Sequence, residues 1–397
     1  LYEASGERKK AIAAYEKASS LHADSAGLHY RLGVLYYQEA QMEPALNHLL
    51  TAARLDPNQA PAYHGLGEIY QRQERWEEAK RAYLKALELN PAMASAHFHL
   101  GEIAEIQGDP GRAILHYGQA IDRGLDLPFL FEQLGLLLYG QGRPAEAEAA
   151  LQKARDLGSQ RAAVHNALGE IYQSRGMREE AESAYLRSIH LDPNLASAHA
   201  NLGNIYLVQG RWEAGLGSYQ EAIKRDFRLQ ERLRSQMAEA EGGLGQALWR
   251  AGKDDEALLH LKRALSWQPE RVSDLKAIAQ SCYEQGRPEA ERYLSAALAV
   301  DPNWGEAYLA LFNLYLKQER RTEAMSSLKK ALSLFPNGAE LHHHLGLLHW
   351  EEGEMDSAAS ELARAVELDP KRSASWVALG DIHRSQRNWR EAIRDYE

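Results

Sequence analysis

The chain repeats itself with a period of 34 residues, and this self-similarity constrains its fold more than any other feature. The segment Tyr63–Tyr70 returns as His165–Tyr172 and again as His199–Tyr206. The last two copies begin 34 residues apart, and the first two begin 102 residues apart, which is three periods. Repeats of this length are supersecondary units that bury their apolar faces only against neighbouring units. The sequence therefore predicts a solenoid rather than separate globular domains.

A second signature lies between these copies and indicates the kind of repeat. After the first copy come Ala79, Tyr83, Ala86 and Pro91, and after the second come Ala181, Tyr185, Ser188 and Pro193. Together the two signatures resemble the tetratricopeptide repeat (TPR) family, in which an aromatic residue, Leu-Gly and Tyr are followed by Ala, an aromatic residue and Pro. The resemblance covers the whole chain. It implies an all-α fold, a right-handed superhelical solenoid of antiparallel helix hairpins.

The register can be followed along the whole sequence. Leu-Gly pairs or their substitutes run from Leu32 to Leu379 at spacings of 34, apart from eight extra residues before Leu244 and one fewer before Leu311. This register predicts ten complete repeats. The predicted division is a partial repeat at 1–25, repeats one to six at 26–229, a helical insertion at 230–237, repeats seven to ten at 238–371 and a partial repeat at 372–397.

Small residues and helix breakers recur at fixed positions of the repeat, which is numbered here so that Leu66 and Gly67 are positions 7 and 8. Gly or Ala at position 8 lets two helices approach closely, and large residues at positions 4, 11 and 24 fill the remaining space. Glycine at position 15, as in Gly108, suits a left-handed turn between two helices. Proline at position 32, as in Pro91, ends the second helix.

Composition and charge exclude several classes of function. The chain has 56 Asp and Glu against 46 Lys and Arg, a formal charge of −10, whereas nucleic-acid or anionic-membrane binding needs clustered positive charge. No run of about 18 apolar residues occurs, so no membrane span is predicted. The single cysteine, Cys282, cannot form an internal disulfide. A lone cysteine suits a reducing compartment, and we expect a cytoplasmic location.

Catalytic and metal-binding motifs are missing from the sequence. It contains no P-loop, HExxH, CxxC, GxSxG or EF-hand pattern. The run His342-His343-His344 is the one histidine cluster, but adjacent helical residues point about 100° apart and cannot easily share a metal ion. We therefore predict no catalytic residues, no metal site and no cofactor, and the chain is not expected to be an enzyme.

The candidate binding residues lie at positions 2, 5, 9, 12 and 13 of the first helices, opposite the packing stripe. In TPR proteins this inner stripe lines a concave groove that binds ligands. Position 12 carries Tyr37, Tyr139, Trp249, Tyr283 and Trp350. These aromatic residues either anchor an apolar stripe of a partner peptide or pack against the adjacent helix, and the sequence leaves both interpretations open.

Position 9 and its neighbours carry polar candidates. Glu68, Glu102 and Glu170 give the first half of the stripe a negative character, which favours a basic ligand segment. Further along, Asn166, Asn201 and Asn204 form the best group of amides. Amide side chains both donate and accept hydrogen bonds, so they can bind the backbone of an extended peptide without reading its side chains.

These features predict a protein–protein interaction scaffold that binds a partner segment in its groove and organises an assembly. The alternative is a targeting or substrate-recruiting arm of a longer enzyme, such as a glycosyltransferase or sulfotransferase, with its catalytic domain outside this chain. Sequence beyond Glu397 would discriminate between the two. A third interpretation, an assembly factor of the cell envelope, requires a signal sequence before Leu1.

The sequence gives three further, local expectations. The insertion has good helix formers, so it should lengthen the first helix of the seventh repeat. The repeat motif does not require glycine at Gly242 or Gly243. These residues are therefore expected to mark a weak point of the helix, which flexes or which a ligand backbone approaches. Neither end resembles a polar capping helix. We therefore expect the array to continue, or its ends to meet another copy or a different subunit.

Overall fold

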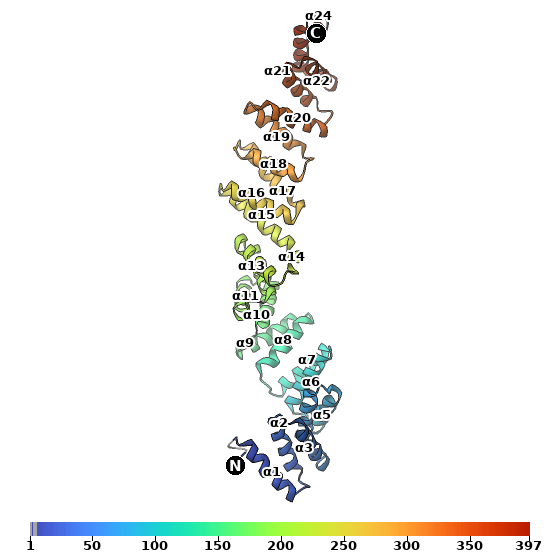
Figure 1. Cartoon of the computed structure of the whole chain (residues 1–397), viewed down its shortest axis with the longest axis vertical. Helices are drawn as coiled ribbons and strands as arrows, with labels where there is room; N and C mark the ends of the chain where they lie inside the picture. Colours follow the sequence, from blue (N-terminus) through green and yellow to red (C-terminus); the bar gives the residue numbers. More distant parts are fainter. Residues whose placement is uncertain (1, 3–5) are drawn as a thin grey trace. The chain divides into compact units, whose positions relative to one another are not determined.

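The structure is a computed structural model that describes residue 2 and residues 6–397. Over these residues the chain forms 24 α-helices, one short 3-10 helix (η1, Pro269–Arg271) and no β-strand (Figure 1). The predicted all-α fold is therefore confirmed for the described part of the chain. It divides into two compact units: unit 1 ends at Asn201 and unit 2 begins at Leu202.

Unit 1 begins with a single helix, α1 (Arg8–Leu21), which is followed by antiparallel hairpins in chain order. The first helices of these hairpins are α2 (Ala26–Gln38), α4 (Ala60–Arg72), α6 (Ala94–Ile106), α8 (Pro128–Gly140) and α10 (Ala162–Ser174). The second helices are α3 (Met42–Leu55), α5 (Trp76–Leu89), α7 (Pro110–Asp122), α9 (Pro144–Asp156) and α11 (Arg178–Leu191). The next first helix, α12 (Ala196–Val208), contains the boundary between the units.

Unit 2 continues the same alternation of helices. Its other first helices are α15 (Arg234–Arg250), α17 (Val272–Glu284), α19 (Gly305–Lys317), α21 (Ala339–Glu351) and α23 (Ser373–Ser385). Its second helices are α13 (Trp212–Arg225), α16 (Asp254–Trp267), α18 (Ala290–Val300), α20 (Arg321–Leu334), α22 (Met355–Leu368) and α24 (Trp389–Tyr396). Among the described helices, none is both long and apolar enough to cross a membrane.

Every hairpin turns through one residue in the left-handed region at position 15. Gly108, for example, has φ +72°, as predicted for a glycine at this position. The same conformation occurs where the sequence has no glycine, at Ala40 (φ +56°), Glu74 (+57°), Glu319 (+60°) and Arg387 (+63°). Left-handed conformations cost non-glycine residues about 1–2 kcal/mol. The hairpin packing therefore imposes the turn even where the local sequence disfavours it.

Within a hairpin, the small residue at position 8 lies against the large residue at position 24 of the next helix. A Cβ atom added to Gly67 would lie 2.5 Å from Cε1 of Tyr83, and one added to Gly33 would lie 2.6 Å from Cγ of Leu49. Tyr83 is fully buried by this arrangement. The close approach predicted from the small residues is thus present in the structure.

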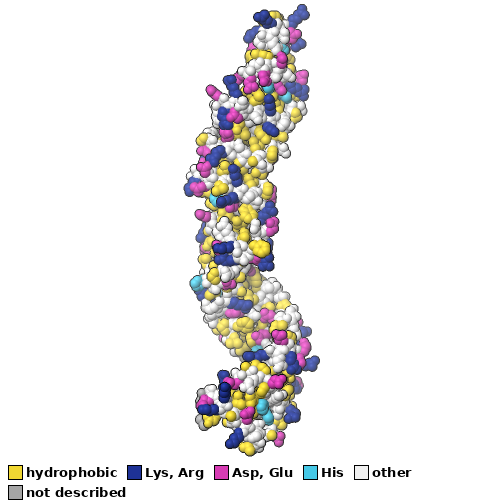
Figure 2. All heavy atoms as spheres, viewed as in Figure 1, with side chains coloured by type: hydrophobic (Ala, Val, Ile, Leu, Met, Phe, Trp, Pro, Cys, Tyr) yellow, Lys and Arg dark blue, Asp and Glu magenta, His cyan; other side chains and the backbone are white. Residues whose placement is uncertain are grey.

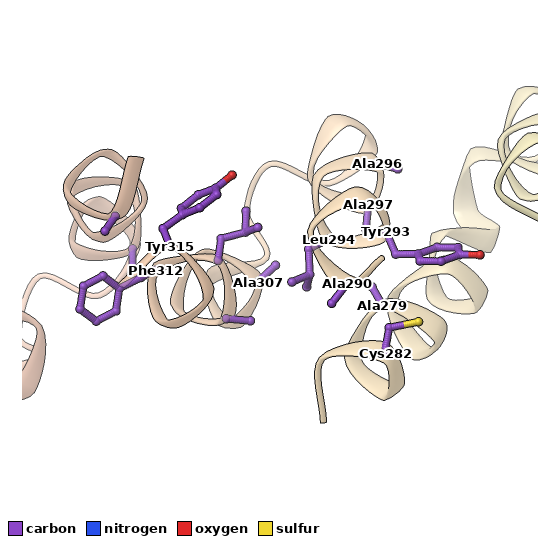
Figure 3. Close-up of a cluster of buried hydrophobic side chains, with 14 of the residues drawn as sticks. Ala279, Cys282, Ala290, Tyr293, Leu294, Ala296, Ala297, Ala307, Phe312 and Tyr315 are labelled. Atoms are coloured by element: carbon purple, nitrogen blue, oxygen red, sulfur yellow. The ribbon is translucent and has the colours of Figure 1, made fainter. Parts of the chain in front are cut away.

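The core of unit 2 shows how neighbouring hairpins share one apolar layer (Figure 3). Ala279 and Cys282 on α17 pack with Tyr293 and Leu294 on α18, and the cluster extends to Phe312 on α19. All five side chains are buried. α18 has 11 residues and begins at Ala290, so Pro288 lies in the turn that precedes it.

The insertion before α15 is helical in two pieces rather than one. A short helix, α14 (Leu229–Arg232), is separated from α15 by a turn at Leu233. α15 has 17 residues where most first helices have 13. Leu233 is buried, so the turn allows an apolar side chain to reach the core. The first helix of the seventh repeat is thus lengthened, as expected, and the turn at Leu233 separates it from α14.

Close packing explains the glycine at position 243, although the repeat motif does not require one there. A Cβ atom added there would lie 2.7 Å from Cδ2 of Trp212 on α13. Gly242 differs, because a Cβ atom at that position would meet its nearest neighbour, Nη2 of Arg271, at an ordinary contact distance of 3.5 Å. The glycine pair therefore contains one residue required by close packing and one that is not.

Candidate functional site

On the face drawn in Figure 2, no single patch of one residue type dominates. Acidic, basic and hydrophobic side chains are interspersed over the helices of this face (Figure 2). Recognition must therefore be sought in local groups of side chains. The inner stripe forms two such groups in unit 1, called here the Glu68 pocket and the Glu170 cluster.

The Glu68 pocket lies where the hairpins α2/α3, α4/α5 and α6/α7 follow one another. It has a volume of about 460 Å³ and is lined by Tyr37, Glu68, Gln71, Arg72, Trp76, Tyr83 and His99. The guanidinium group of Arg72 lies over the ring of Tyr37, 4.7 Å from its centroid. Burial raises the pKa of Glu68. Two predicted site residues, Tyr37 and Glu68, therefore line the same pocket, but Arg72 partly covers the aromatic ring.

Hydrogen bonds connect this pocket to the third predicted residue, Glu102. Gln71 Nε2 donates to Glu102 Oε2 at 3.0 Å, and Gln71 Oε1 accepts from the hydroxyl of Tyr83 at 2.8 Å. His99 Nδ1 lies 2.8 Å from the same Glu102 oxygen. Tyr83 and His99 stack with their ring centroids 5.2 Å apart. Glu102 is thus held by side chains of two repeats.

A second imidazole, that of His64 at position 5 of α4, lies close to this pocket. The ring of His64 lies 5.5 Å from the ring of His99, measured between centroids, and His64 Nδ1 lies 3.6 Å from Glu68 Oε2. Burial, followed by the charge of His99, lowers the pKa of His64 to about 4. His64 is therefore neutral at neutral pH, with a lone pair on one ring nitrogen.

The Glu170 cluster brings together four predicted residues from three successive first helices. Asn166 Nδ2 on α10 and Asn201 Nδ2 on α12 both donate to Glu170 Oε1, at 2.9 and 2.8 Å. Asn201 also donates to Asn166 Oδ1 at 3.3 Å. On α8, burial together with a hydrogen bond to Glu170 raises the pKa of Tyr139 to about 12. The amides are thus organised around a carboxylate rather than aligned as separate peptide ligands.

Between these two groups, a further carboxylate receives hydrogen bonds from neighbouring repeats. Glu105 accepts from Tyr117 at 2.9 Å and from Gln133 at 3.0 Å. Gln133 in turn accepts from Arg161 at 2.5 Å. None of these residues stood among the sequence candidates. Glu105 occupies position 12, where the candidate binding residues are aromatic. Its residue type therefore gave no signal that it would accept hydrogen bonds from neighbouring repeats.

In unit 2, the predicted residues take part in packing between helices. Asn204 accepts a hydrogen bond from the buried Tyr219 at 2.9 Å. The indole of Trp249 donates to Cys282 Sγ at 3.3 Å. Tyr283 accepts from Asn313 at 3.1 Å, and Trp350 packs against an apolar cluster formed by α22 and α23. Packing against the adjacent helix, one of the two interpretations left open, thus describes Trp249 and Trp350.

The histidines of α21 do not converge on one point. His342 Nδ1 lies 2.6 Å from Glu361, whereas His343 Nδ1 lies 2.9 Å from the hydroxyl of Ser375. His349 lies close to Glu352 and Glu354, and its Nδ1 is 2.6 Å from Glu354 Oε2. Each ring therefore has a partner of its own.

Models of the tetratricopeptide repeat match nearly all of this helical array. The matched residues are 2–68, 64–125, 133–196, 194–267, 309–373 and 375–397. The chain belongs to the tetratricopeptide repeat family. This assignment agrees with the hairpins and turns described above. TPR arrays are typical of scaffolds for protein interactions, which is the general class supported for this TPR protein.

Solved TPR structures resemble the chain only in part. The crystal structure of MamA is 23% identical, covering 41% of this chain and 95% of MamA, with a TM-score of 0.37. PilF of Pseudomonas aeruginosa is 20% identical over 60% of this chain and 99% of its own, with a TM-score of 0.40. YrrB, described as a TPR protein with an unusual peptide-binding site, is 25% identical over 54% of this chain and 92% of its own, with a TM-score of 0.28. The comparison with curated proteins finds no match. At these TM-scores, the similarities support no conclusion about partners.

Proposed function

We propose that this TPR protein is an interaction scaffold that binds a protein segment carrying basic side chains along the first helices of unit 1. The observation that carries the proposal is the Glu170 cluster. Two amides and a phenol from neighbouring repeats surround one carboxylate, so the charge is positioned before a ligand arrives. Preorganised groups of this kind lower the cost of binding.

The negative character of the stripe supports a basic partner. Glu68 and Glu102 are partly buried, with 31% and 25% of their side chains exposed, and Glu105 lies beyond them. Pairing across an interface between opposite charges favours the matching partner and disfavours acidic ones. The proposal assigns no catalysis to the chain: its function is to position a partner within an assembly.

A peptide-binding experiment with matched charge variants tests this proposal. Extended synthetic peptides with Lys or Arg at alternate positions, and the same peptides with Glu, are titrated against the full chain by fluorescence anisotropy in the presence of EDTA. The basic series should bind and the acidic series should not. Binding should weaken as salt is added, because ions screen charges that remain in contact with solvent.

Glu170→Gln is the informative variant, since glutamine keeps an acceptor oxygen for Asn166 and Asn201 while removing the charge. A lost hydrogen bond to a charged group is worth about 1.5–3 kcal/mol, so affinity should fall by roughly tenfold or more. Glu179→Gln, on the exposed start of α11, is the matched control. Equal affinities for basic and acidic peptides, or equal effects of the two variants, would contradict the proposal.

A further inference from the structure

The most specific chemical arrangement in the molecule is a group of two histidines and one glutamate from adjacent repeats. His64 and Glu68 lie one turn apart on α4, and His99 lies on α6. One ligand atom from each of the three side chains lies within 4.8 Å of the others. His64 Nδ1 is 3.6 Å from Glu68 Oε2, and His99 Nε2 is 4.0 Å from Glu68 Oε1.

A neighbouring carboxylate orients one of these histidines. Glu102 Oε2 lies 2.8 Å from His99 Nδ1, and Gln71 holds the same oxygen at 3.0 Å. A carboxylate only accepts hydrogen bonds, so the proton of His99 belongs on Nδ1 and the lone pair on Nε2, the atom nearer to Glu68. Metal-binding histidines commonly have such a carboxylate behind them.

A second observation concerns Nε2 of His64, whereas the nitrogen that lies 3.6 Å from Glu68 Oε2 is Nδ1. His64 Nε2 is buried and has no hydrogen-bond partner among the described residues. Buried polar side-chain atoms are paired in the large majority of cases, and an exception calls for an explanation. Of the histidines on the inner stripe of unit 1, His64 combines this unpaired atom with a nearby carboxylate and a second imidazole.

We propose that His64, Glu68 and His99 form a binding site for a divalent transition-metal ion of the zinc class. Zinc binds imidazole nitrogen and carboxylate oxygen at about 2.0–2.2 Å in a tetrahedron, which places neighbouring ligand atoms about 3.3 Å apart. The separations of 3.6 and 4.0 Å, which join the histidines to the two different oxygens of Glu68, exceed this by about 0.3 and 0.7 Å, so the side chains must rotate to close on one ion. Three protein ligands leave one coordination position for water or for a side chain of a partner.

The ligand set also selects the class of ion. Calcium and magnesium prefer sites built from oxygen atoms alone, whereas imidazole nitrogen suits zinc, copper, iron and nickel. A bound dication would reverse the local charge at the Glu68 pocket. The inference shares Glu68 and Glu102 with the proposed basic stripe, but it can fail separately, because the Glu170 cluster carries the peptide proposal and the metal ion is measured without a peptide.

Metal titration of the full chain tests the inference. The protein is dialysed against a chelator and titrated with ZnCl2 by calorimetry, and with CoCl2 by visible absorption, since ligand-field bands report tetrahedral nitrogen and oxygen ligands. We expect one ion per chain at this site. Glu68→Gln and His99→Gln should each abolish it, and Glu102→Gln should weaken it by about 10–100-fold, as found for groups behind metal ligands.

His116→Gln is the matched control, because His116 lies in the same unit and its Nδ1 is 3.4 Å from another imidazole, that of His97, without forming a three-ligand group. It should bind the ion like the original chain. Far-UV circular dichroism and urea unfolding confirm that each variant is folded. Retention of the ion by both Glu68→Gln and His99→Gln would place the metal elsewhere, for example at His349, and would overturn the proposal. Absence of zinc and cobalt binding to the folded original chain would also overturn it.

Discussion

Gly169 lies directly against the ring of Tyr185, so that a Cβ atom at position 169 would come within 2.5 Å of Tyr185 Cε1. The two residues are sixteen positions apart, on the two helices of one hairpin, α10 and α11. Tyr185 is fully buried, and its hydroxyl donates to Gln173 at 2.7 Å. The ring is held at both ends and cannot move away without loss of that hydrogen bond.

Gly169→Ala should therefore destabilise unit 1, although alanine is normally the better helix former. Overpacking of a well-filled core costs about 1–3 kcal/mol. The control is Gly118→Ala in α7, where no other described atom lies within 4 Å of the added Cβ and a gain of about 0.5–1 kcal/mol is expected. Urea unfolding followed by circular dichroism measures both. The same sign of change for the two variants would contradict the packing argument.

In unit 2, alanine substitutions of Gly242 and Gly243 should likewise change the free energy of unfolding in opposite directions. Gly243→Ala should lower the free energy of unfolding, because the new methyl group meets Trp212 at 2.7 Å. Gly242→Ala has room and should raise it by about 0.5–1 kcal/mol. Tryptophan fluorescence of Trp212 should shift only in the first variant. Hydrogen exchange over 240–246 tests the flexing hypothesis: if flexing occurs, this segment exchanges faster than its neighbours and Gly242→Ala slows it.

Acid should destabilise unit 1 through His97. Burial, followed by the charges of Arg123 and His116, lowers the pKa of this residue to about 4, against about 6.5 in the unfolded chain. Between these values the unfolded state binds more protons, so stability is complete above pH 6.5 and falls as the pH decreases to 4. Tyr63 occupies the same repeat position as His97, so His97→Tyr introduces a residue that this position accepts. The stability of this variant should depend less steeply on pH. Urea midpoints at several pH values measure it, and an unchanged slope would be evidence against this role.

Cys282 should react with thiol reagents only when unit 2 opens. The side chain is fully buried, burial raises the pKa of its thiol, and the thiolate is the reactive form. Labelling of the native protein should be slow and should accelerate with urea in parallel with unfolding. Trp249→Phe removes the indole N–H that bonds to Cys282 Sγ and that lowers the pKa of the thiol, so the native protein should hold even less thiolate and should not label faster. Rapid labelling of the folded original chain would show that the cysteine is accessible.

The repeat period alone predicted much of the architecture. Spacing of apolar and small residues decides which face of a helix is buried, and this information lies within a single hairpin. The left-handed turn at position 15 and the contact between positions 8 and 24 could therefore be predicted from one repeat, and Gly108 and Gly67 show both. The turn at Leu233 could not, because it depends on an apolar side chain reaching a core formed by other helices.

The sequence by itself determined the class of fold, the hairpins and the stripe on which the candidate residues lie, since these follow from local periodicity. Only the tertiary structure decided which stripe residues meet. The rotation between successive hairpins and the rotamers of long side chains place His99 beside Glu68 and direct Asn201 to Glu170. The same geometry turns Trp249 onto Cys282. A pattern of residue types does not specify these angles, because many side-chain arrangements are compatible with the same helical face.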